Sequence, residues 1–357
     1  MSFRDNLRKV TPYVPGEQPR GSVIKLNTNE CPYPPSPKVA EALRNMDPER
    51  LRLYPEVGIE TLTEALSAYY GVKKEQIFAG VGSDDVLSMC FLAFFEGKKP
   101  VLFPDVTYSF YDVWAEVYRI PYRTVPLDPD FRIRPEDYLA ENGGIVIANP
   151  NAPTGRAEEL SVLQEIIEKN QDSVVIIDEA YVDFGGETAL PLIDRYPNLA
   201  VVRTMSKSRA MAGMRIGYAF ASRELMEVLQ AVKYSVNSYT MNTPSILAGA
   251  AAIKDESYFR EITEKIIKTR ERSRDVLCGL GFSCGRSSTN FLFAKPPEGI
   301  GAARVFEALK ERRIYVRHFK KPERIADYLR ITVGTEEEMD ALFAALREIL
   351  PALREEA

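Results

Sequence analysis

The chain has 357 residues, a length that predicts one large domain and one smaller domain. Hydrophobic residues make up 45% and charged residues 27%, which excludes a disordered chain, a collagen-like fibre and a disulfide-rich mini-protein. The net charge of −5 gives no basic excess for nucleic acid, and no apolar run approaches the ~20 residues of a membrane span. We therefore expect no nucleic-acid or membrane partner.

The cysteines and the single histidine narrow the possible chemistry. Cys31, Cys90, Cys278 and Cys284 form no CxxC pair, so we expect reduced thiols and no metal site. The N-terminal sequence lacks the apolar core of a secretory signal, which together with reduced thiols predicts a cytoplasmic protein. Because His318 is the only histidine, histidine-based triads and most zinc hydrolases are excluded. In an enzyme, another residue type must then move protons.

Helices and strands alternate through the middle of the chain. The first 55 residues are rich in proline and predict an extended arm, not a packed element. Helices are predicted at 59–70, at 83–95 with Ser83 or Asp84 as the cap, and at 158–169. Apolar runs with little polar alternation predict seven buried strands, at 76–79, 100–104, 120–125, 144–149, 173–178, 199–204 and 215–221. This pattern predicts a doubly wound α/β domain with a mainly parallel seven-stranded sheet.

The character of the sequence changes after about residue 245. An amphipathic helix is predicted at 257–280, followed by strands at 290–294, 314–319 and 329–333 and by helices at 302–312 and from 335 onward. We therefore predict an N-terminal arm over residues 1–50 that packs on the small domain. The large domain is predicted over 51–245 and the small α+β domain over 246–357.

Polar residues follow four of the predicted strands where each strand ends. They are NPNAPTG at 149–155, Asp178-Glu179-Ala180-Tyr181, Ser206-Lys207 with Arg215 eight residues after the lysine, and Gly80-Val81-Gly82-Ser83-Asp84-Asp85. Ligands of open parallel sheets bind beyond the carboxyl ends of the strands, so we expect these segments to converge on one rim.

Each of these residues also has a purely structural interpretation. Asp178 is either a cap or ion-pair partner, or an anion that pairs with a cationic ligand nitrogen. Lys207 is either a solvated surface residue or a group for covalent chemistry. The Gly-Val-Gly turn is either a tight turn alone or, with the helix that follows and with Ser83, Ser206 and Arg215, an oxyanion cradle. The third glycine of a dinucleotide fingerprint and the Walker motif are both missing.

Several segments together resemble a known family. NPNAPTG, DEAYVDF, RTMSKSRAMAGMRIGY and LRITVGTEEE, in this order and spacing, resemble the fold-type I pyridoxal-phosphate aminotransferases. KLNTNECPYPPSP, LYPEVG and AGVGSDD, with Arg317 and Arg330, narrow the resemblance to the histidinol-phosphate aminotransferases over nearly the whole chain. The resemblance implies transamination between L-histidinol phosphate and 2-oxoglutarate, giving imidazole-acetol phosphate and glutamate, in histidine biosynthesis.

The resemblance also assigns roles to the candidate residues. Lys207 would form the Schiff base with pyridoxal 5′-phosphate and carry the proton, Asp178 would pair with the pyridinium N–H, and Tyr181 would bond the phenolate oxygen. Tyr108 would stack on the ring, although a core tyrosine is an equal alternative. The remaining implied cofactor contacts are Ser83, Asp84, Asn151, Ser206, Arg215 and, from the partner subunit of a homodimer, Tyr54.

The substrate contacts implied by the resemblance centre on two arginines. Arg317 and Arg330 would bind the substrate phosphate, or a carboxylate of the second substrate, because two guanidinium forks match a dianion. A surface charge is the alternative for Arg317. Asn29 and Tyr13 resemble family residues near the substrate.

Two positions depart from the family pattern. Ala152 stands where the family usually has an asparagine that bonds the cofactor oxygen, so Asn149 or Asn151 compensates, or Tyr181 acts alone. Cys31 stands where asparagine or another polar or aromatic residue is common.

Three other functions stay open at this point. An aromatic amino-acid aminotransferase and a threonine-phosphate decarboxylase of cobamide synthesis share the fold. A cofactor-binding module without turnover is the third, and the joint presence of Lys207, Asp178 and Tyr181 speaks against it.

Overall fold

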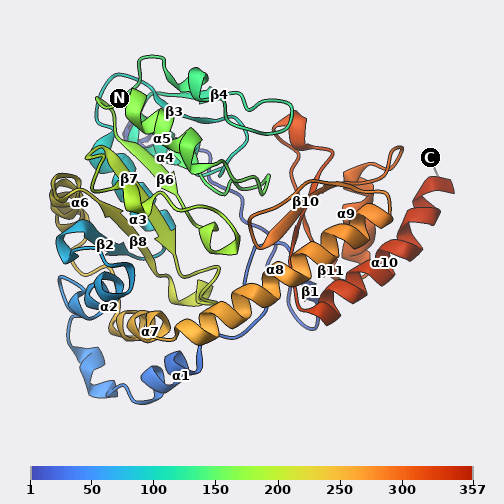
Figure 1. Cartoon of the computed structure of the whole chain (residues 1–357), viewed down its shortest axis with the longest axis horizontal. Helices are drawn as coiled ribbons and strands as arrows, with labels where there is room; N and C mark the ends of the chain where they lie inside the picture. Colours follow the sequence, from blue (N-terminus) through green and yellow to red (C-terminus); the bar gives the residue numbers. More distant parts are fainter. Residues whose placement is uncertain (1, 356–357) are drawn as a thin grey trace.

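The computed structural model describes residues 2–355, in which a seven-stranded sheet forms the largest layer (Figure 1). The strand order is β2-β8-β7-β6-β5-β3-β4, and every neighbouring pair is parallel except those of β8, which is antiparallel to β2 and β7. All seven predicted strands are confirmed: β2 (Ile77–Gly80), β3 (Val101–Pro104), β4 (Tyr122–Val125), β5 (Gly144–Ala148), β6 (Val175–Asp178), β7 (Leu199–Thr204) and β8 (Gly217–Ala221).

Helices cover both faces of this sheet, which explains the apolar strand sequences. In β5, Ile145 and Ile147 enter one core cluster while Val146 enters another, so both faces of the strand are buried. The first cluster includes residues of α2 (Glu60–Tyr70), α5 (Leu160–Lys169) and α7 (Thr243–Ile253). The second includes residues of α3 (Ser83–Phe94), α4 (Tyr111–Tyr118) and α6 (Arg223–Val236).

A second, antiparallel sheet follows in the C-terminal part of the chain. Its order is β12 (Arg317–His318), β13 (Leu329–Thr332), β10 (Phe291–Lys295) and β9 (Ser283–Cys284). It shares a core with α8 (Glu256–Gly279), α9 (Ala302–Glu311) and α10 (Glu336–Glu355). The prediction of one strand at 314–319 was wrong, because the chain changes sheets at the buried Val316. Its first half is β11 (Ile314–Tyr315), which pairs with β1 (Ile24–Lys25).

The N-terminal arm contains a helix that the sequence interpretation missed. α1 (Pro37–Arg44) begins after Ser36, whose hydroxyl accepts a hydrogen bond from the backbone N–H of Lys38. Proline has the dihedral angle of a first helical turn, so the proline-rich sequence is compatible with a helix start. α1 packs against α7, and the Thr332 N–H donates to the carbonyl of Leu26. The domain limits at residues 50 and 245 stay predictions.

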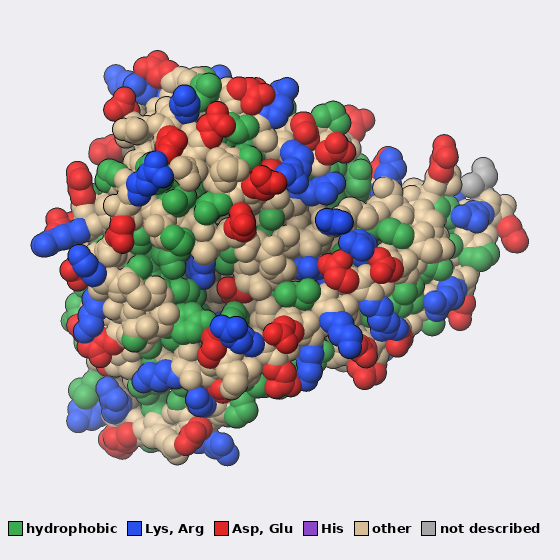
Figure 2. Space-filling model, in the orientation of Figure 1, with side chains coloured by type: hydrophobic (Ala, Val, Ile, Leu, Met, Phe, Trp, Pro, Cys, Tyr) green, Lys and Arg blue, Asp and Glu red, His purple; other side chains and the backbone are tan. Residues whose placement is uncertain are grey.

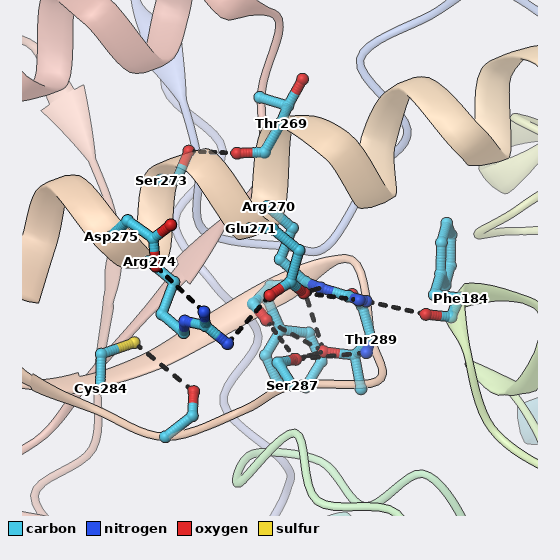
Figure 3. Close-up of polar contacts among 12 residues, drawn as sticks. Phe184, Thr269, Arg270, Glu271, Ser273, Arg274, Asp275, Cys284, Ser287 and Thr289 are labelled. Atoms are coloured by element: carbon cyan, nitrogen blue, oxygen red, sulfur yellow. Dashed lines mark hydrogen bonds and ion pairs between the residues drawn. The ribbon is translucent and has the colours of Figure 1, made fainter.

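A buried arginine on α8 connects the two sheets close to the predicted rim (Figure 3). Arg270 Nη1 donates to the carbonyl of Phe184, which follows β6, and to that of Thr289, which precedes β10, both at 2.8 Å. Its Nε donates to the carboxylate of Glu271 at 2.9 Å. The helix thereby fixes the loop after β6, where Tyr181 lies.

The charged surface is mixed. Acidic and basic side chains are interspersed over the face drawn in Figure 2, in keeping with the small net charge. Within residues 2–355, none of the helices combines the length and the apolar character that crossing a membrane requires.

Candidate active site

A cavity of about 530 Å³ lies at the carboxyl ends of β5, β6 and β7, beside the first turn of α3. The predicted convergence on one rim of the sheet is therefore present. Eight of the predicted site residues line the cavity: Ser83, Asp84, Tyr108, Asp178, Tyr181, Ser206, Lys207 and Arg215. The other six, Tyr13, Asn29, Tyr54, Asn151, Arg317 and Arg330, lie outside its lining.

Lys207 follows β7 and directs its amine into the cavity. Nζ is 3.5 Å from the carbonyl oxygen of Thr28, at the limit of a hydrogen bond, and 5.8 Å from the centroid of the Tyr181 ring. No carboxylate within residues 2–355 forms an ion pair with this amine. A lysine that is held in a cavity without an ion pair can serve as a nucleophile or a proton carrier.

Asp178 is the last residue of β6 and is only 5% exposed. Its Oδ2 accepts a hydrogen bond from the Tyr111 hydroxyl at 2.9 Å, and its Oδ1 accepts one from the Ala180 N–H at 3.1 Å. Burial raises the pKa of Asp178 to about 6, since the loss of water outweighs these two bonds. The described residues provide no ion-pair partner, so a cationic N–H of a ligand would stabilise the carboxylate.

Tyr181 is buried against the small sheet and is held by a residue of the N-terminal arm. Its hydroxyl accepts a hydrogen bond from Asn29 Nδ2 at 2.8 Å, and its ring lies edge-on to Phe291. Asn29 adopts a left-handed backbone, with φ of 56°, which asparagine tolerates better than most residues. Thr332 and Asn290 both bond its backbone. Asn29 therefore acts on the cavity through Tyr181.

Two glycines shape the turn that opens α3. The predicted cap at Ser83 or Asp84 was wrong: Gly82, with φ of 86°, holds the cap position and no side chain bonds the first turn. A Cβ atom on Gly82 would lie 2.4 Å from Arg215 Nη2, and one on Gly217 would lie 2.3 Å from the backbone nitrogen of Ser83. The absence of side chains thus lets β8 touch this turn. The helix N–H groups stay uncapped and can bind an anion.

Arg215 completes this anion site. Its Nη1 lies 3.4 Å from the Ser206 hydroxyl and its Nη2 lies 3.5 Å from Asp84 Oδ2. Tyr108 donates a hydrogen bond to the other oxygen of Asp84 at 2.8 Å. The backbone of Arg215 has φ of 53°, an uncommon conformation for a non-glycine residue and one that often marks functional sites. A guanidinium, a serine hydroxyl and an uncapped helix start suit a phosphate group.

The side chains of both asparagines in the loop after β5 form hydrogen bonds with neighbouring residues of the protein. Asn151 Nδ2 donates to the Val106 carbonyl at 2.9 Å, and its Oδ1 accepts from Thr107 at 2.9 Å. Asn149 bonds the backbone of Glu158 through both atoms of its amide. Neither side chain lines the cavity, whereas Ala152 does. For the predicted bond to the cofactor oxygen, the geometry therefore favours Tyr181, which Asn29 supports, over Asn149 or Asn151.

The two predicted arginines lie opposite each other on adjacent strands, Arg317 on β12 and Arg330 on β13. Arg330 Nη2 donates to the carbonyl of Asn27 at 3.0 Å, while its buried Nε has no hydrogen-bond partner among the described residues. Arg317 donates to the carbonyls of Val14 and Pro15 at 3.2 and 3.4 Å. Burial, reinforced by the charge of Arg317, lowers the pKa of Arg330. Within residues 2–355 neither arginine forms an ion pair, which suits an anionic ligand.

Several cavity residues were missed by sequence reasoning. Pro15, Gln18, Thr28 and Glu30 line the cavity from the N-terminal arm, and Tyr111 bonds Asp178 from α4. Two of these had a signal, because Thr28 and Glu30 stand inside the NTNECP motif.

The two predicted tyrosines outside the cavity lie in different surroundings. Tyr13 packs on the ring of Phe110, with centroids 4.2 Å apart. Tyr54 is 80% exposed and stacks on Tyr239, with centroids 4.4 Å apart.

Comparison with known proteins agrees with this geometry. A family model described as aminotransferase class I and II matches residues 21–346. The chain is 50% identical to the histidinol-phosphate aminotransferase of Chromohalobacter salexigens, over 96% of this chain and 97% of that protein. It is 49% identical to that of Lactococcus lactis subsp. cremoris, over 98% of each. The fold is also similar to a solved structure, that of histidinol-phosphate aminotransferase from Sinorhizobium meliloti in complex with pyridoxal-5′-phosphate, with a TM-score of 0.83. The two sequences are 26% identical, and the match covers 92% of this chain and 91% of that one.

Proposed function

Because the chain belongs to the class I and II aminotransferases, and among them to the histidinol-phosphate aminotransferases, we propose that it transfers the amino group of L-histidinol phosphate to 2-oxoglutarate. The reaction belongs to histidine biosynthesis and leaves imidazole-acetol phosphate and glutamate. One observation carries the proposal: the amine of Lys207, which has no ion pair within the described part of the chain, shares a cavity with the buried carboxylate of Asp178.

The residues of the cavity fit pyridoxal 5′-phosphate. Bound there, this cofactor supplies a carbon that reacts with amines and a protonated ring that withdraws electrons. Ser206, Arg215 and the N–H groups at the start of α3 would hold its phosphate. Asp178 would bond the ring nitrogen, which gives the buried carboxylate the cationic partner that it lacks. Tyr181 would bond the phenolate oxygen, and the ring of Tyr108 would cover one face of the cofactor.

Lys207 would carry the proton in both halves of the reaction. Its Nζ would take the proton from the Cα atom of the bound substrate and would return a proton to the cofactor carbon to which the substrate nitrogen is joined. The position of the lysine at the end of β7, at the limit of bonding distance from the Thr28 carbonyl, leaves the amine free to do so. No histidine is required, in agreement with a sequence that has only one.

Arg317 and Arg330 would bind the anionic end of each substrate. In histidinol phosphate this end is a dianion, which uses both guanidinium groups, while 2-oxoglutarate presents a carboxylate to the same pair. The cross-strand placement of two arginines that form no ion pair with any described residue supports this role. Tyr13 would border the same substrate, and Asn29 would act on it through Tyr181.

A homodimer in the cytoplasm is part of the proposal. Tyr54 stacks on Tyr239, and the hydroxyl of Tyr234 bonds the carbonyl of Val57, so segment 51–57 and the end of α6 form one exposed apolar patch. Exposed patches of this kind suit protein contacts. A second copy would cover the patch, with Tyr54 reaching the cofactor phosphate of the partner. All four cysteine thiols are free, which fits a reducing compartment.

A comparison of amino donors tests the proposal. The protein loaded with pyridoxal 5′-phosphate is given 2-oxoglutarate and, in turn, histidinol phosphate, phenylalanine or threonine phosphate, and kcat/KM is measured for each. We expect histidinol phosphate to be preferred over phenylalanine by at least ~100-fold, since a phosphate held by two arginines contributes about 3 kcal/mol or more. A preference for phenylalanine would support the aromatic aminotransferase instead. Release of CO2 from threonine phosphate would support the decarboxylase.

A further inference from the structure

Three carboxylates line the cavity, and two of them have both oxygens engaged. Asp178 accepts hydrogen bonds on both oxygens from Tyr111 and from the Ala180 N–H. Asp84 accepts a bond from Tyr108 on one oxygen and lies 3.5 Å from Arg215 with the other. Neither is left to recognise a substrate.

In the third carboxylate, that of Glu30, only one of the two oxygens accepts hydrogen bonds. Its Oε2 accepts hydrogen bonds from both Lys25, at 2.5 Å, and the Thr28 hydroxyl, at 2.8 Å. Its Oε1 makes no hydrogen bond or ion pair with any residue that the structure describes. Desolvation opposes the charged form, but Lys25 and Thr28 lower the pKa of Glu30 below its ordinary value. An ionised oxygen therefore remains available in the cavity.

The backbone that carries Glu30 is fixed before any substrate arrives. The N–H of Asn29 donates to Thr332 at 3.0 Å, and Asn290 donates to the carbonyl of Asn29 at 2.9 Å. Thr28 connects the carboxylate to the reaction centre, because its hydroxyl bonds Glu30 while its carbonyl lies 3.5 Å from Lys207 Nζ. Glu30 thus has a set position close to the reacting amine.

A free carboxylate oxygen is unexpected in a cavity built for anions. The cofactor and the substrate each bring a phosphate, so a further negative charge is repelled unless the ligand also offers a hydrogen-bond donor. Histidinol phosphate has two kinds of nitrogen donor, its amine and its imidazole. The amine is consumed in the reaction, which leaves the ring N–H, one methylene from Cα. The phenyl ring of phenylalanine has no such donor.

We propose that Glu30 accepts a hydrogen bond from the imidazole ring of the amino donor, and so selects an imidazole over a phenyl side chain. The proposal rests on the function proposed above and deepens it by naming the residue that recognises the ring. It also separates the two ends of the substrate: Glu30 binds the ring, and Arg317 and Arg330 bind the phosphate.

The test compares two ligands that cannot react because they lack an amine. They are 3-(imidazol-4-yl)propyl phosphate and 3-phenylpropyl phosphate, titrated by calorimetry into the protein loaded with pyridoxal 5′-phosphate. Glu30→Gln keeps the size of the side chain and removes its charge. We expect the Kd of the imidazole ligand to rise by about 10- to 100-fold, the range for a hydrogen bond to a charged group, and that of the phenyl ligand to change by less than about twofold.

Glu17→Gln is the matched control. Glu17 lies on the same arm and pairs with Lys310, but it does not line the cavity, so both Kd values should stay as in the wild type. Equal weakening of both ligands in Glu30→Gln, or no weakening of either, would overturn the proposal. The proposed function is tested separately by wild-type turnover of histidinol phosphate, so the two failures are distinguishable.

Discussion

At the scale of single residues, the candidate site contains groups that stability alone would disfavour. Among residues 2–355, Asp178 in the cavity is a buried carboxylate without an ion pair, and Arg330, outside the cavity lining, has a buried Nε without a hydrogen-bond partner. Buried polar groups of this kind cost free energy unless something bonds them. The buried carboxylate of Asp178 in the same cavity as the amine of Lys207 is the physical sign that a ligand completes the site.

Lys207 gives the first prediction at this scale. Lys207→Ala should lower kcat by at least about 1000-fold, because the substitution removes both the nucleophile and the proton carrier. Lys265→Ala removes an exposed lysine that pairs with Glu261, and it should leave kcat unchanged. Steady-state rates of glutamate formation provide the measurement. Retention of more than a trace of activity in Lys207→Ala would assign the chemistry to another residue.

Asp178 makes a prediction about pH and stability. Its pKa is about 6 in the folded protein and about 3.9 when unfolded, so as pH rises between these values the unfolded chain ionises first. In the cofactor-free protein, the free energy of unfolding relative to Asp178→Asn should therefore fall by up to about 3 kcal/mol from pH 4 to pH 7. Urea unfolding of both proteins across this range measures the difference. A difference that is independent of pH would contradict the buried, uncompensated carboxylate.

Asp178→Asn should benefit the stability of the cofactor-free protein but should harm catalysis by the protein loaded with pyridoxal 5′-phosphate. Asp178→Asn removes the charge that stabilises a protonated ring nitrogen, so kcat should fall by orders of magnitude. In the proposed function, Asp178 is therefore a residue that is unfavourable for the empty fold and is kept for the cofactor.

Sequence reasoning located those residues that directly follow strands. Asp178 was found because a charged group after a buried apolar run is costly without a ligand. Lys207 was found because Ser206 and Arg215 frame it on the rim where Asp178 is predicted. Tyr111 was missed because its bond to Asp178 joins segments that are far apart in the sequence. Glu30 stands in a recognisable motif, but only the fold brings the N-terminal arm to the cavity. Likewise, the sequence did not reveal that Asn149 and Asn151 are hydrogen-bonded to other parts of the protein and not directed into the cavity.

At the scale of elements, the hairpin formed by β12 and β13 carries both arginines of the proposed substrate site. Cross-strand pairing puts Arg317 opposite Arg330, and like charges in this position repel each other unless an anion lies between them. The sheet therefore holds the two guanidinium groups in place for a phosphate.

Substitution of each arginine makes the third prediction. Arg330→Ala should lower kcat/KM for histidinol phosphate by at least about 30-fold, since truncating one member of a buried charged pair costs about 2–5 kcal/mol. It should also damage the half-reaction with glutamate. Arg317→Ala should affect histidinol phosphate more than glutamate, because a single carboxylate needs the second guanidinium less. Arg312→Ala, on the exposed surface beside Glu348, is the control. Equal losses with phenylalanine and histidinol phosphate in Arg317→Ala would argue against phosphate recognition.

Secondary structure was predictable where burial dominates the sequence pattern. All seven strands of the large sheet follow from apolar runs, but their directions do not, so the antiparallel β8 was not foreseen. α1 was missed because its prolines were interpreted as breakers, whereas Ser36-Pro37 is a helix start. The strand at 314–319 is divided because each half pairs with a different strand, which is a tertiary effect.

At the scale of the whole molecule, the exposed patch around Tyr54 and Tyr239 bears on assembly. Tyr54 lies outside the cavity lining of its own chain, so a role at a cofactor phosphate requires a second copy. The proposed homodimer therefore makes each active site depend on two chains.

Subunit mixing makes the fourth prediction. Tyr54→Ala should lower activity, and Lys207→Ala should abolish it. In a mixed dimer, the site with the intact lysine receives the intact tyrosine from its partner. Mixing the two variants should therefore raise activity above that of either one, up to about half of the wild-type activity per mixed dimer. Activity after dissociation and reassociation is the measurement. Absence of any recovery, with mixed dimers demonstrated, would place Tyr54 outside the partner's site.

Transfer of nitrogen tests the central claim most directly. The protein loaded with pyridoxal 5′-phosphate is incubated with histidinol phosphate that carries ¹⁵N in its amine and with unlabelled 2-oxoglutarate, and the glutamate formed is analysed by mass spectrometry. We predict one labelled glutamate for each imidazole-acetol phosphate, and none with Lys207→Ala. Unlabelled glutamate, or loss of histidinol phosphate without labelled glutamate, would contradict the assignment.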